Sequence, residues 1–354
     1  MEGLVTTGLG AKNFAGRRVL ITGHRGFKGS WLSLWLTRSG ARVTGFSDAI
    51  PTDPCHFSIL QLDLDDRRGD ICNPATVEAA MVETKPEIVF HFAAQSLVRK
   101  AYSDPIATYR ANVLGTLAVL EAARRHDVRA VVLATTDKVY RNDESGRRYN
   151  EHDELGGSDP YSASKSCAEL VARSYRETIA PDGAMLIATV RAGNVVGGGD
   201  WAEDRLFPDL MRAAFSGRPA VIRNPGSTRP WQHVLDVLAG YLAIGARLVE
   251  GDTGAAEAWN LGPQAASGIT VQHVVDVIRR EFRQLRIDVR PDDSGRGESA
   301  LLQLDSSKAI ERLAWQPRWE ADMLERTVAW YRAFYDQGRV ISNEQLDAYE
   351  AALA

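Results

Sequence analysis

Three glycines spaced three residues apart limit most strongly what this chain can fold into. Gly23, Gly26 and Gly29 follow an apolar, β-branched run at 17–23 and precede a helical pattern that ends at Gly40. In such a turn the backbone can approach a pyrophosphate, whose charge the positive end of the helix stabilises. The spacing therefore predicts a dinucleotide site, and a glycine-rich turn that binds nothing is the alternative.

The rest of the first half alternates between strand and helix patterns. Four further apolar runs are typical of strands, and they lie at 41–47, 87–93, 130–136 and 185–192. Strands joined by helical crossovers are parallel, and a parallel sheet is buried on both faces. We interpret the ambiguous residues 56–64 as a short helix before a strand near 67–71.

The character of the sequence changes after residue 193. Gly, Pro, Asp and Asn gather in loop segments such as GNVVGGGDW, and helical patterns return further on. We expect an α/β protein with a doubly wound parallel Rossmann sheet and a smaller C-terminal α/β domain for the substrate. The chain divides into a flexible tail (1–15), a sheet domain (16–192, with 230–262) and a substrate domain (193–229 and 263–345).

Composition argues against several classes of protein. The 354 residues are 44% hydrophobic with a formal net charge of −4, so charge indicates neither a nucleic-acid nor a membrane surface. Cys55, Cys72 and Cys167 are odd in number and lack metal-ligand spacing, which favours a reducing compartment. No signal-peptide pattern opens the chain, and no apolar run reaches the roughly 20 residues of a membrane helix. We expect a cytoplasmic protein without a metal site.

Two acidic residues are placed to read the adenosine half of a dinucleotide. Asp48 ends the second strand about 20 residues after the turn, where a carboxylate binds ribose hydroxyls and repels a 2′-phosphate. Asp70 and Ile71 follow the third strand, where they would contact the adenine ring. These positions favour NAD over NADP. An ordinary turn residue at Asp48 and a helix cap at Asp70, before Pro74, are the alternatives.

A tyrosine and a lysine form a candidate catalytic pair. Tyr161 and Lys165 lie four residues apart on a helical pattern and so share one face. A free tyrosine has a pKa of about 10, too high for a base at neutral pH, and a nearby ammonium lowers it. The pair therefore predicts a base that takes a proton from a substrate hydroxyl, and a surface pair is the alternative.

Three polar residues end the strand pattern at 130–136. Thr136, Asp137 and Lys138 would lie beyond the carboxyl end of a strand, where open α/β sheets bind their ligands. A hydroxyl, a carboxylate and an amine in succession indicate substrate contact and proton transfer. A turn with solvated charges fits the composition equally well.

These motifs resemble the extended short-chain dehydrogenase/reductase family, in its nucleotide-sugar epimerase and dehydratase branch. The resemblance is carried by TGHRGFKG, HFAAQ and DPYSASK. Longer segments are similar to the members of this branch that dehydrate CDP-glucose, and they are HRGFKGSWLSLWL, HFAAQSLVR, TTDKVY, GGSDPYSASK, VRAGNVVGGGDWAEDR and RPWQHV. The similarity runs from about residue 16 to residue 335. Lys138 stands where related dehydratases usually carry Glu, and Thr136 where they usually carry Ser.

The resemblance implies an internal redox cycle on bound NAD. Tyr161, with Thr136 in contact, would take the proton of the glucose 4-hydroxyl while hydride passes to NAD. Lys138 would then remove the proton on carbon five, and Asp137 would protonate the departing 6-hydroxyl. The return of hydride to carbon six would give CDP-4-keto-6-deoxyglucose, a precursor of deoxysugars.

The resemblance also implies two sets of binding residues. The cofactor contacts are Gly23, Gly26, Phe27, Gly29, Asp48, Asp70, Ile71, Ala93, Tyr161 and Lys165. The contacts to CDP-glucose are Gln95, Asn194, Arg205, Arg229 and His233, with guanidinium groups suited to phosphate oxygens.

Two other functions stay open. A 4-epimerase or reductase of the same family would transfer hydride but would need no elimination pair. A redox sensor that only binds NAD would need neither Tyr161 nor Lys165. In any of these cases, the apolar faces of the helices near 107–126 and 161–180 predict a homodimer or tetramer, as in the family.

Overall fold

A parallel seven-stranded sheet forms the centre of the computed structural model, which describes residues 11–180, 183–264, 268–290 and 302–353. The strand order is β12-β7-β5-β4-β1-β2-β3, and every neighbouring pair is parallel. The strands are β1 (Arg18–Thr22), β2 (Arg42–Ser47), β3 (Asp65–Arg68), β4 (Ile88–His91), β5 (Ala130–Ala134), β7 (Leu186–Ala192) and β12 (Ala258–Leu261). The chain winds outward from β1 to β3 and then returns to build the other half from β4. The predicted doubly wound Rossmann sheet is confirmed.

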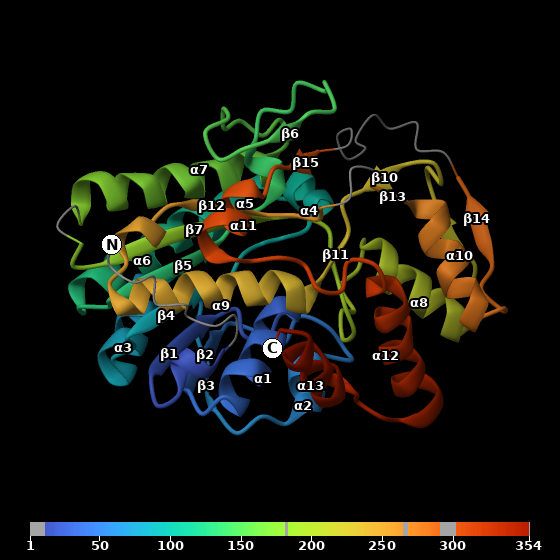
Figure 1. Cartoon of the computed structure of the whole chain (residues 1–354), viewed down its shortest axis with the longest axis horizontal. Helices are drawn as coiled ribbons and strands as arrows, with labels where there is room; N and C mark the ends of the chain where they lie inside the picture. The colour runs from blue at the N-terminus through green and yellow to red at the C-terminus, as the bar shows by residue number, and fades with distance from the viewer. Residues whose placement is uncertain (1–10, 181–182, 265–267, 291–301, 354) are drawn as a thin grey trace.

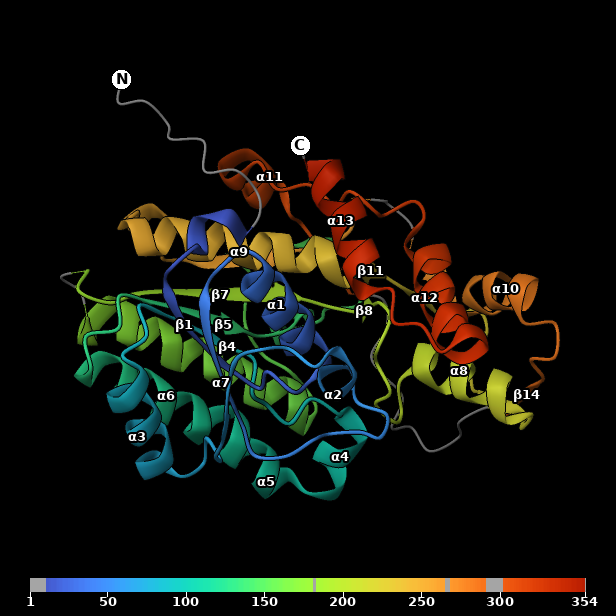
Figure 2. The ribbon, with the colours of Figure 1, turned by 90° about the horizontal axis from the view of Figure 1, so that it is seen from below.

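Helices cover both faces of this sheet (Figure 1; Figure 2). On one face lie α1 (Phe27–Arg38) and α9 (Val234–Glu250), and on the other lie α3 (Pro74–Thr84), α6 (Thr116–Arg125) and α7 (Pro160–Ser174). Side chains along β1 alternate between two apolar cores: Val19 and Ile21 join the first face, and Leu20 joins the second. This alternation is the period of a strand that is buried on both sides.

A second group of elements lies beyond one end of the sheet (Figure 1). It contains α8 (Leu206–Ser216), α10 (Val271–Glu281) and α12 (Met323–Gln337), with the parallel pair β9 (Ala220–Ile222) and β14 (Ile287–Val289). These residues fall within the region that the sequence assigns to the substrate, and the domain boundaries themselves stay predictions.

The remaining helices and strands complete the described chain. They are η1 (Ala11–Phe14), α2 (His56–Leu60), α4 (Val98–Ser103), α5 (Pro105–Tyr109), η2 (Arg110–Gly115), η3 (Asp137–Val139), β6 (Arg148–Tyr149), η4 (Tyr175–Ile179), β8 (Val195–Val196), β10 (Thr228–Arg229), β11 (Gln232–His233), η5 (Thr253–Ala255), β13 (Ile269–Thr270), β15 (Gln303–Leu304), α11 (Ser307–Leu313) and α13 (Ser342–Leu353). Among the helices of the described ranges, none has the length and apolar character needed to cross a membrane.

The structure differs from the sequence prediction at the N-terminus. Ala11–Phe14 form a 3₁₀-helix in which Ala11 and Phe14 are fully buried, and the Phe14 ring lies 5.8 Å from that of Phe90. This end of the predicted tail therefore packs against the sheet, because Phe14 is a large apolar side chain beside β4. The rest of the tail, residues 1–10, lies outside the described residues.

Candidate active site

The two candidate catalytic segments meet at the carboxyl end of β5. Thr136, Asp137 and Lys138 follow this strand, and Tyr161 lies in the first turn of α7. Asp159 fixes where α7 begins, because its Oδ1 accepts hydrogen bonds from the backbone of Tyr161 (2.9 Å) and Ser162 (3.0 Å). Pro160 at the first helical position reinforces this start.

Hydrogen bonds and close packing hold Thr136, Asp137 and Tyr161 together. The Thr136 hydroxyl donates to Asp137 Oδ1 at 2.9 Å, and Thr136 is also hydrogen-bonded to the Tyr161 side chain. Asp137 is only 3% exposed, and its carboxylate lies against Gly193. A Cβ at Gly193 would lie 2.0 Å from Asp137 Oδ2, so only glycine leaves room for the carboxylate there. Asp137, Tyr161 and Gly193 are far apart in the sequence, and the fold brings them together around Thr136.

Burial and nearby cations oppose one another at Tyr161. Burial raises the pKa of this phenol above its ordinary value and outweighs the hydrogen bond with Thr136 and the positive charge of Lys138, which act to lower it. Arg205 contributes in the same direction as Lys138. Arg205 itself is held by Asp200 (2.9 Å) and by the Ser96 hydroxyl (3.1 Å). The structure thus brings Arg205, a predicted substrate residue, to the catalytic tyrosine.

Lys165 lies on α7, one helical turn after Tyr161. Its Nζ donates to the carbonyl oxygen of Ala134, at 3.0 Å, and the residue is 5% exposed. Burial and, to a smaller extent, the charge of Lys28 lower the pKa of Lys165 to about 7, against the opposing effect of Glu169. The sequence predicted that Lys165 would lower the pKa of Tyr161. The net shift is the opposite: burial raises the pKa of Tyr161 above its ordinary value, so the predicted lowering is wrong for this structure. The cations that oppose the rise are Lys138 and Arg205, because the Lys165 ammonium donates to the carbonyl oxygen at the end of β5.

The glycine turn has the shape that a pyrophosphate needs. Gly23 adopts a positive φ of 74°, and a Cβ there would lie 2.6 Å from the backbone nitrogen of Ala93. A Cβ at Gly29 would lie 2.2 Å from the carbonyl oxygen of Gly23, so this glycine lets α1 begin close to the strand. Gly26 caps α1, which starts at Phe27, with the helix N-terminus open to an anion. The turn therefore fits a dinucleotide.

The predicted adenosine contacts lie at the same edge of the sheet. Asp48 is exposed at the end of β2, and Asp70 is exposed after β3. The alternative of Asp70 as a helix cap is wrong, since Asn73 caps α3 and Asp70 Oδ1 accepts from the backbone of Cys72 at 2.8 Å. Ile71 is 6% exposed. The roles of these residues toward the cofactor stay predictions.

Two other predicted substrate residues shape the loops around the site. The side chain of Gln95 donates to Leu97 O (3.1 Å) and to the Thr108 hydroxyl (2.9 Å), which closes the loop after β4. Asn194 has a positive φ of 43° directly after Gly193, and its carbonyl accepts from Gln232 N at 3.2 Å. Both residues therefore set backbone geometry beside the catalytic group.

His233 is not brought to this group. His233 is fully buried: its Nδ1 accepts from Leu235 N at 3.2 Å to cap α9, and its ring lies 4.8 Å from that of Trp319. In this structure it is a helix cap without access to a ligand, which the sequence could not show because Trp319 is distant along the chain.

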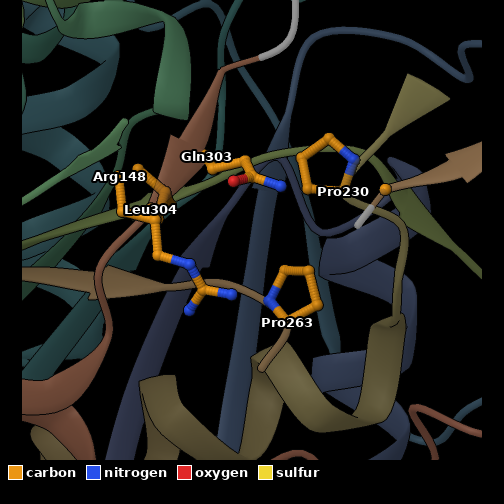
Figure 3. A pocket seen from close by; sticks show the side chains of 6 residues that line it. Arg148, Pro230, Pro263, Gln303 and Leu304 are labelled. Carbon is orange, nitrogen blue, oxygen red and sulfur yellow. The ribbon is translucent and has the colours of Figure 1, made fainter. Parts of the chain in front are cut away.

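Arg229 lies on the short strand β10, next to a separate cavity. The cavity is lined by Arg148, Pro230, Pro263, Gly268, Gln303 and Leu304 (Figure 3). Figure 3 shows the Arg148 side chain extending toward Pro263, and its Nη2 donates to Gln264 O at 2.9 Å. The role of Arg229 toward the substrate stays a prediction.

Sequence reasoning missed Lys28, in the first turn of α1. Its Nζ lies 5.8 Å from the ring centroid of Phe92 and 5.9 Å from that of Tyr241. Burial lowers the pKa of Lys28 to about 8, as does the charge of Arg205, while Asp137 opposes the shift. The Tyr241 hydroxyl is buried without a hydrogen-bond partner among the described residues. The available signal was a lysine between the second and third glycines of the turn, where the helix must pack closely.

Comparisons with known proteins agree with this geometry. A model of the NAD dependent epimerase/dehydratase family matches residues 19–262. The chain belongs to this family. Its glycine turn fits the cofactor that the family uses, and NAD is the cofactor of this chain. In the described part of the chain, no group of three or more His, Cys, Asp or Glu side chains is arranged to hold a metal ion.

Among characterised members of the family, the chain is 42% identical to the CDP-glucose 4,6-dehydratase of Salmonella typhimurium, over 96% of this chain and 98% of that protein. It is 30% identical to the dTDP-glucose 4,6-dehydratase of Streptomyces antibioticus, over 89% of this chain and 92% of that protein. Among solved structures, an epimerase of Methanothermobacter thermautotrophicus superposes with a TM-score of 0.82 at 24% identity, over 94% of this chain and 98% of that one. A dTDP-glucose 4,6-dehydratase of Streptomyces venezuelae, solved with NAD, has a TM-score of 0.77 at 24% identity, over 91% of this chain and 100% of that one.

The lowered pKa of Lys165 predicts how the stability of the cofactor-free protein depends on pH. The folded state releases this proton near pH 7, whereas the unfolded chain holds it to about 10.5. Between these values the unfolded state binds more protons, so the contribution of Lys165 to stability rises with pH. Lys165→Met should flatten this rise, measured as the free energy of unfolding in denaturant between about pH 6 and pH 10.

Lys12→Met, at an exposed position of η1, is the control for this experiment and should follow the wild-type curve. An equally steep rise in Lys165→Met would show that another group is responsible.

Proposed function

We propose that this enzyme dehydrates CDP-glucose to CDP-4-keto-6-deoxyglucose, a step that leads to deoxysugars. The observation that carries the proposal is the position of Asp137 and Lys138 beside the Tyr161 hydroxyl, with Thr136 joining them through hydrogen bonds. Tyr161 serves oxidation, and the other two serve the loss of water. The identity to a CDP-glucose 4,6-dehydratase over nearly the whole chain supports this assignment.

In the first step, Tyr161 removes a proton from the sugar. Its phenol lies at the carboxyl end of the sheet, and Thr136 and Arg205 act to stabilise the phenolate. A base in this position takes the proton of the 4-hydroxyl as that carbon is oxidised. When bound, NAD accepts a hydride from carbon four and returns it to carbon six, so the cycle uses no net oxidant.

In the second step, Lys138 and Asp137 remove water. The ketone at carbon four acidifies the hydrogen on carbon five, and Lys138, as the neutral amine, takes this proton. Asp137 gives a proton to the departing 6-hydroxyl, which leaves as water. Lys138 then returns a proton, exchangeable with solvent, to carbon five as carbon six is reduced. The buried Asp137 carboxylate is fixed by Thr136 and enclosed by Gly193, so it is aimed before the substrate arrives.

The runner-up function is a nucleotide-sugar 4-epimerase or a reductase of the same family. Either enzyme would use Tyr161 in the same way. Neither would need an acid and a base next to the tyrosine, and the convergence of Asp137 and Lys138 on it therefore favours the dehydratase.

A panel of nucleotide sugars tests the proposed function. With CDP-, TDP-, UDP- and GDP-glucose as substrates, we expect kcat/KM for the 4-keto product to be highest with CDP-glucose. The product is measured by its absorbance in base. Formation of stable CDP-galactose would identify an epimerase, and release of stoichiometric NADH would identify a dehydrogenase, so either result would contradict the proposal.

Two substitutions separate the chemical steps. Tyr161→Phe should abolish oxidation of the sugar while NAD binding is retained, because only the phenolic oxygen is lost. Lys138→Ala should still allow oxidation but slow elimination by roughly 10²- to 10⁴-fold, the usual contribution of a general base. Rapid-quench analysis of the sugar products distinguishes the two. Full dehydration by Lys138→Ala would remove this residue from the proposed role.

We also propose that two copies of the chain pair through α5, α6, η2 and α7, which pack side by side on the sheet (Figure 2). Several large apolar side chains remain exposed on these elements: Ile106 (80%), Tyr109 (38%), Leu114 (58%), Leu117 (38%) and Leu170 (51%). An exposed apolar patch of this kind marks an interface.

Replacement of Leu114 and Leu170 by Arg together should convert the homodimer into a monomer, because two charges cannot be buried unpaired in an apolar interface. Sedimentation velocity measures the change. Val221→Arg, at a position 51% exposed on β9, is the matched control and should remain dimeric. An unchanged sedimentation coefficient in the double variant would place the interface elsewhere.

The state of the cysteines bears on the cellular location. The three cysteines Cys55, Cys72 and Cys167 are all free thiols, as expected in a reducing compartment. We infer that the enzyme works in the cytoplasm.

A further inference from the structure

A buried ion pair contacts the residues on either side of Thr136, Asp137 and Lys138, the candidate catalytic segment. Glu169 on α7 and Arg191 on β7 have side chains that are 2% and 5% exposed, with 2.9 Å between Glu169 Oε2 and Arg191 Nη2. Glu169 follows Lys165 by one helical turn. Although burial alone would raise the pKa of Glu169, the charge of Arg191 and the surrounding hydrogen bonds lower it below its usual value. The carboxylate is therefore a fixed negative charge in the interior.

Each partner of this pair holds one end of the catalytic segment. Glu169 Oε1 accepts from the hydroxyl of Thr135 at 2.5 Å, immediately before Thr136. Arg191 Nη1 donates to the hydroxyl oxygen of Tyr140 at 2.9 Å, two residues after Lys138. The three catalytic candidates are thus bracketed by two residues that are anchored on one ion pair.

The far side of the pair is anchored equally firmly. Glu169 Oε2 also accepts from the Thr189 hydroxyl at 2.8 Å, on β7. The hydroxyl of Tyr140 donates to Asn260 Oδ1 on β12 at 2.7 Å, and Arg191 Nη1 also donates to Glu151 O at 3.2 Å. The ion pair therefore links the catalytic segment to β7 and β12 of the sheet and to α7, which carries Tyr161.

We infer that the Glu169–Arg191 pair is a clamp that positions Thr136, Asp137 and Lys138 against Tyr161. This inference rests on the proposed dehydratase function. The side chains of Glu169 and Arg191 are buried, and we assign them a positioning role that acts through Thr135 and Tyr140. A segment held at both ends keeps its side chains in the geometry for reaction, and a displacement of about 1 Å can lower a rate by roughly 10²-fold.

Two threonines provide a matched test of the clamp. Thr135 and Thr189 are 4% and 0% exposed, and each donates one hydroxyl hydrogen bond to Glu169. Thr135→Val and Thr189→Val each remove one of these bonds and keep the shape of the side chain. Thr135→Val also removes a longer contact of the same hydroxyl, to the carbonyl oxygen of Val190 at 3.2 Å. Only Thr135 adjoins the catalytic segment. A purely structural role of the pair predicts similar effects of both substitutions, and a positioning role predicts different ones.

We expect Thr135→Val to lower kcat for dehydration of CDP-glucose by roughly ten- to hundredfold, with KM changed less than about threefold. Thr189→Val should change kcat by less than about threefold at a comparable loss of thermal stability. Tyr140→Phe releases the other end of the segment and should resemble Thr135→Val. Thr135→Ser restores the hydroxyl and should recover most of kcat.

Equal losses of kcat in Thr135→Val and Thr189→Val, or losses that follow the change in melting temperature, would overturn the clamp. No loss in Thr135→Val would overturn it as well. The wild-type enzyme is assayed alongside, since failure of the wild type to form the 4-keto product would contradict the proposed function instead of the clamp.

Discussion

The contact on which the site depends is the buried hydrogen bond from Lys165 Nζ to the carbonyl oxygen of Ala134, which joins α7 to the end of β5. Tyr161 lies one turn before this lysine, and Thr136–Lys138 begin two residues beyond that carbonyl. One contact between α7 and β5 therefore aligns the residue proposed for oxidation with the residues proposed for loss of water. One helical turn after Lys165, the Glu169–Arg191 pair makes a second connection between α7 and the sheet.

The site concentrates positive charge in a place with little water. Arg205 acts electrostatically on Lys28, and Lys28 acts on Lys165, while Asp137, Glu169 and Asp200 are acidic groups beside them. Burial and neighbouring positive charge lower the pKa of Lys28 to about 8 and that of Lys165 to about 7, so that these amines can gain or lose protons near neutral pH. An enzyme that moves several protons around one sugar needs groups of this kind close to the reacting carbons.

Most of the sheet and the catalytic group could be predicted because their signals are local. The glycine turn, the apolar strands and the Tyr161–Lys165 spacing each lie within a few residues of sequence. The sequence was less informative where packing between distant segments decides the outcome. Phe14 belongs to the core because Phe90 lies beneath it, and His233 is a buried cap because Trp319 covers it. Glu169 could have been found by its spacing from Lys165, but the bond to Thr135 is visible only in three dimensions.

In the proposed cycle, one sugar is oxidised, dehydrated and reduced without leaving the site. The most direct measurement follows the fate of the hydrogen on carbon four, with CDP-glucose deuterated at that carbon as substrate and mass spectrometry and NMR of the product. An internal cycle places the deuterium on carbon six of the 4-keto-6-deoxy product, with one solvent hydrogen on carbon five. Deuterium that returns to carbon four, or that leaves on released cofactor, would contradict the account.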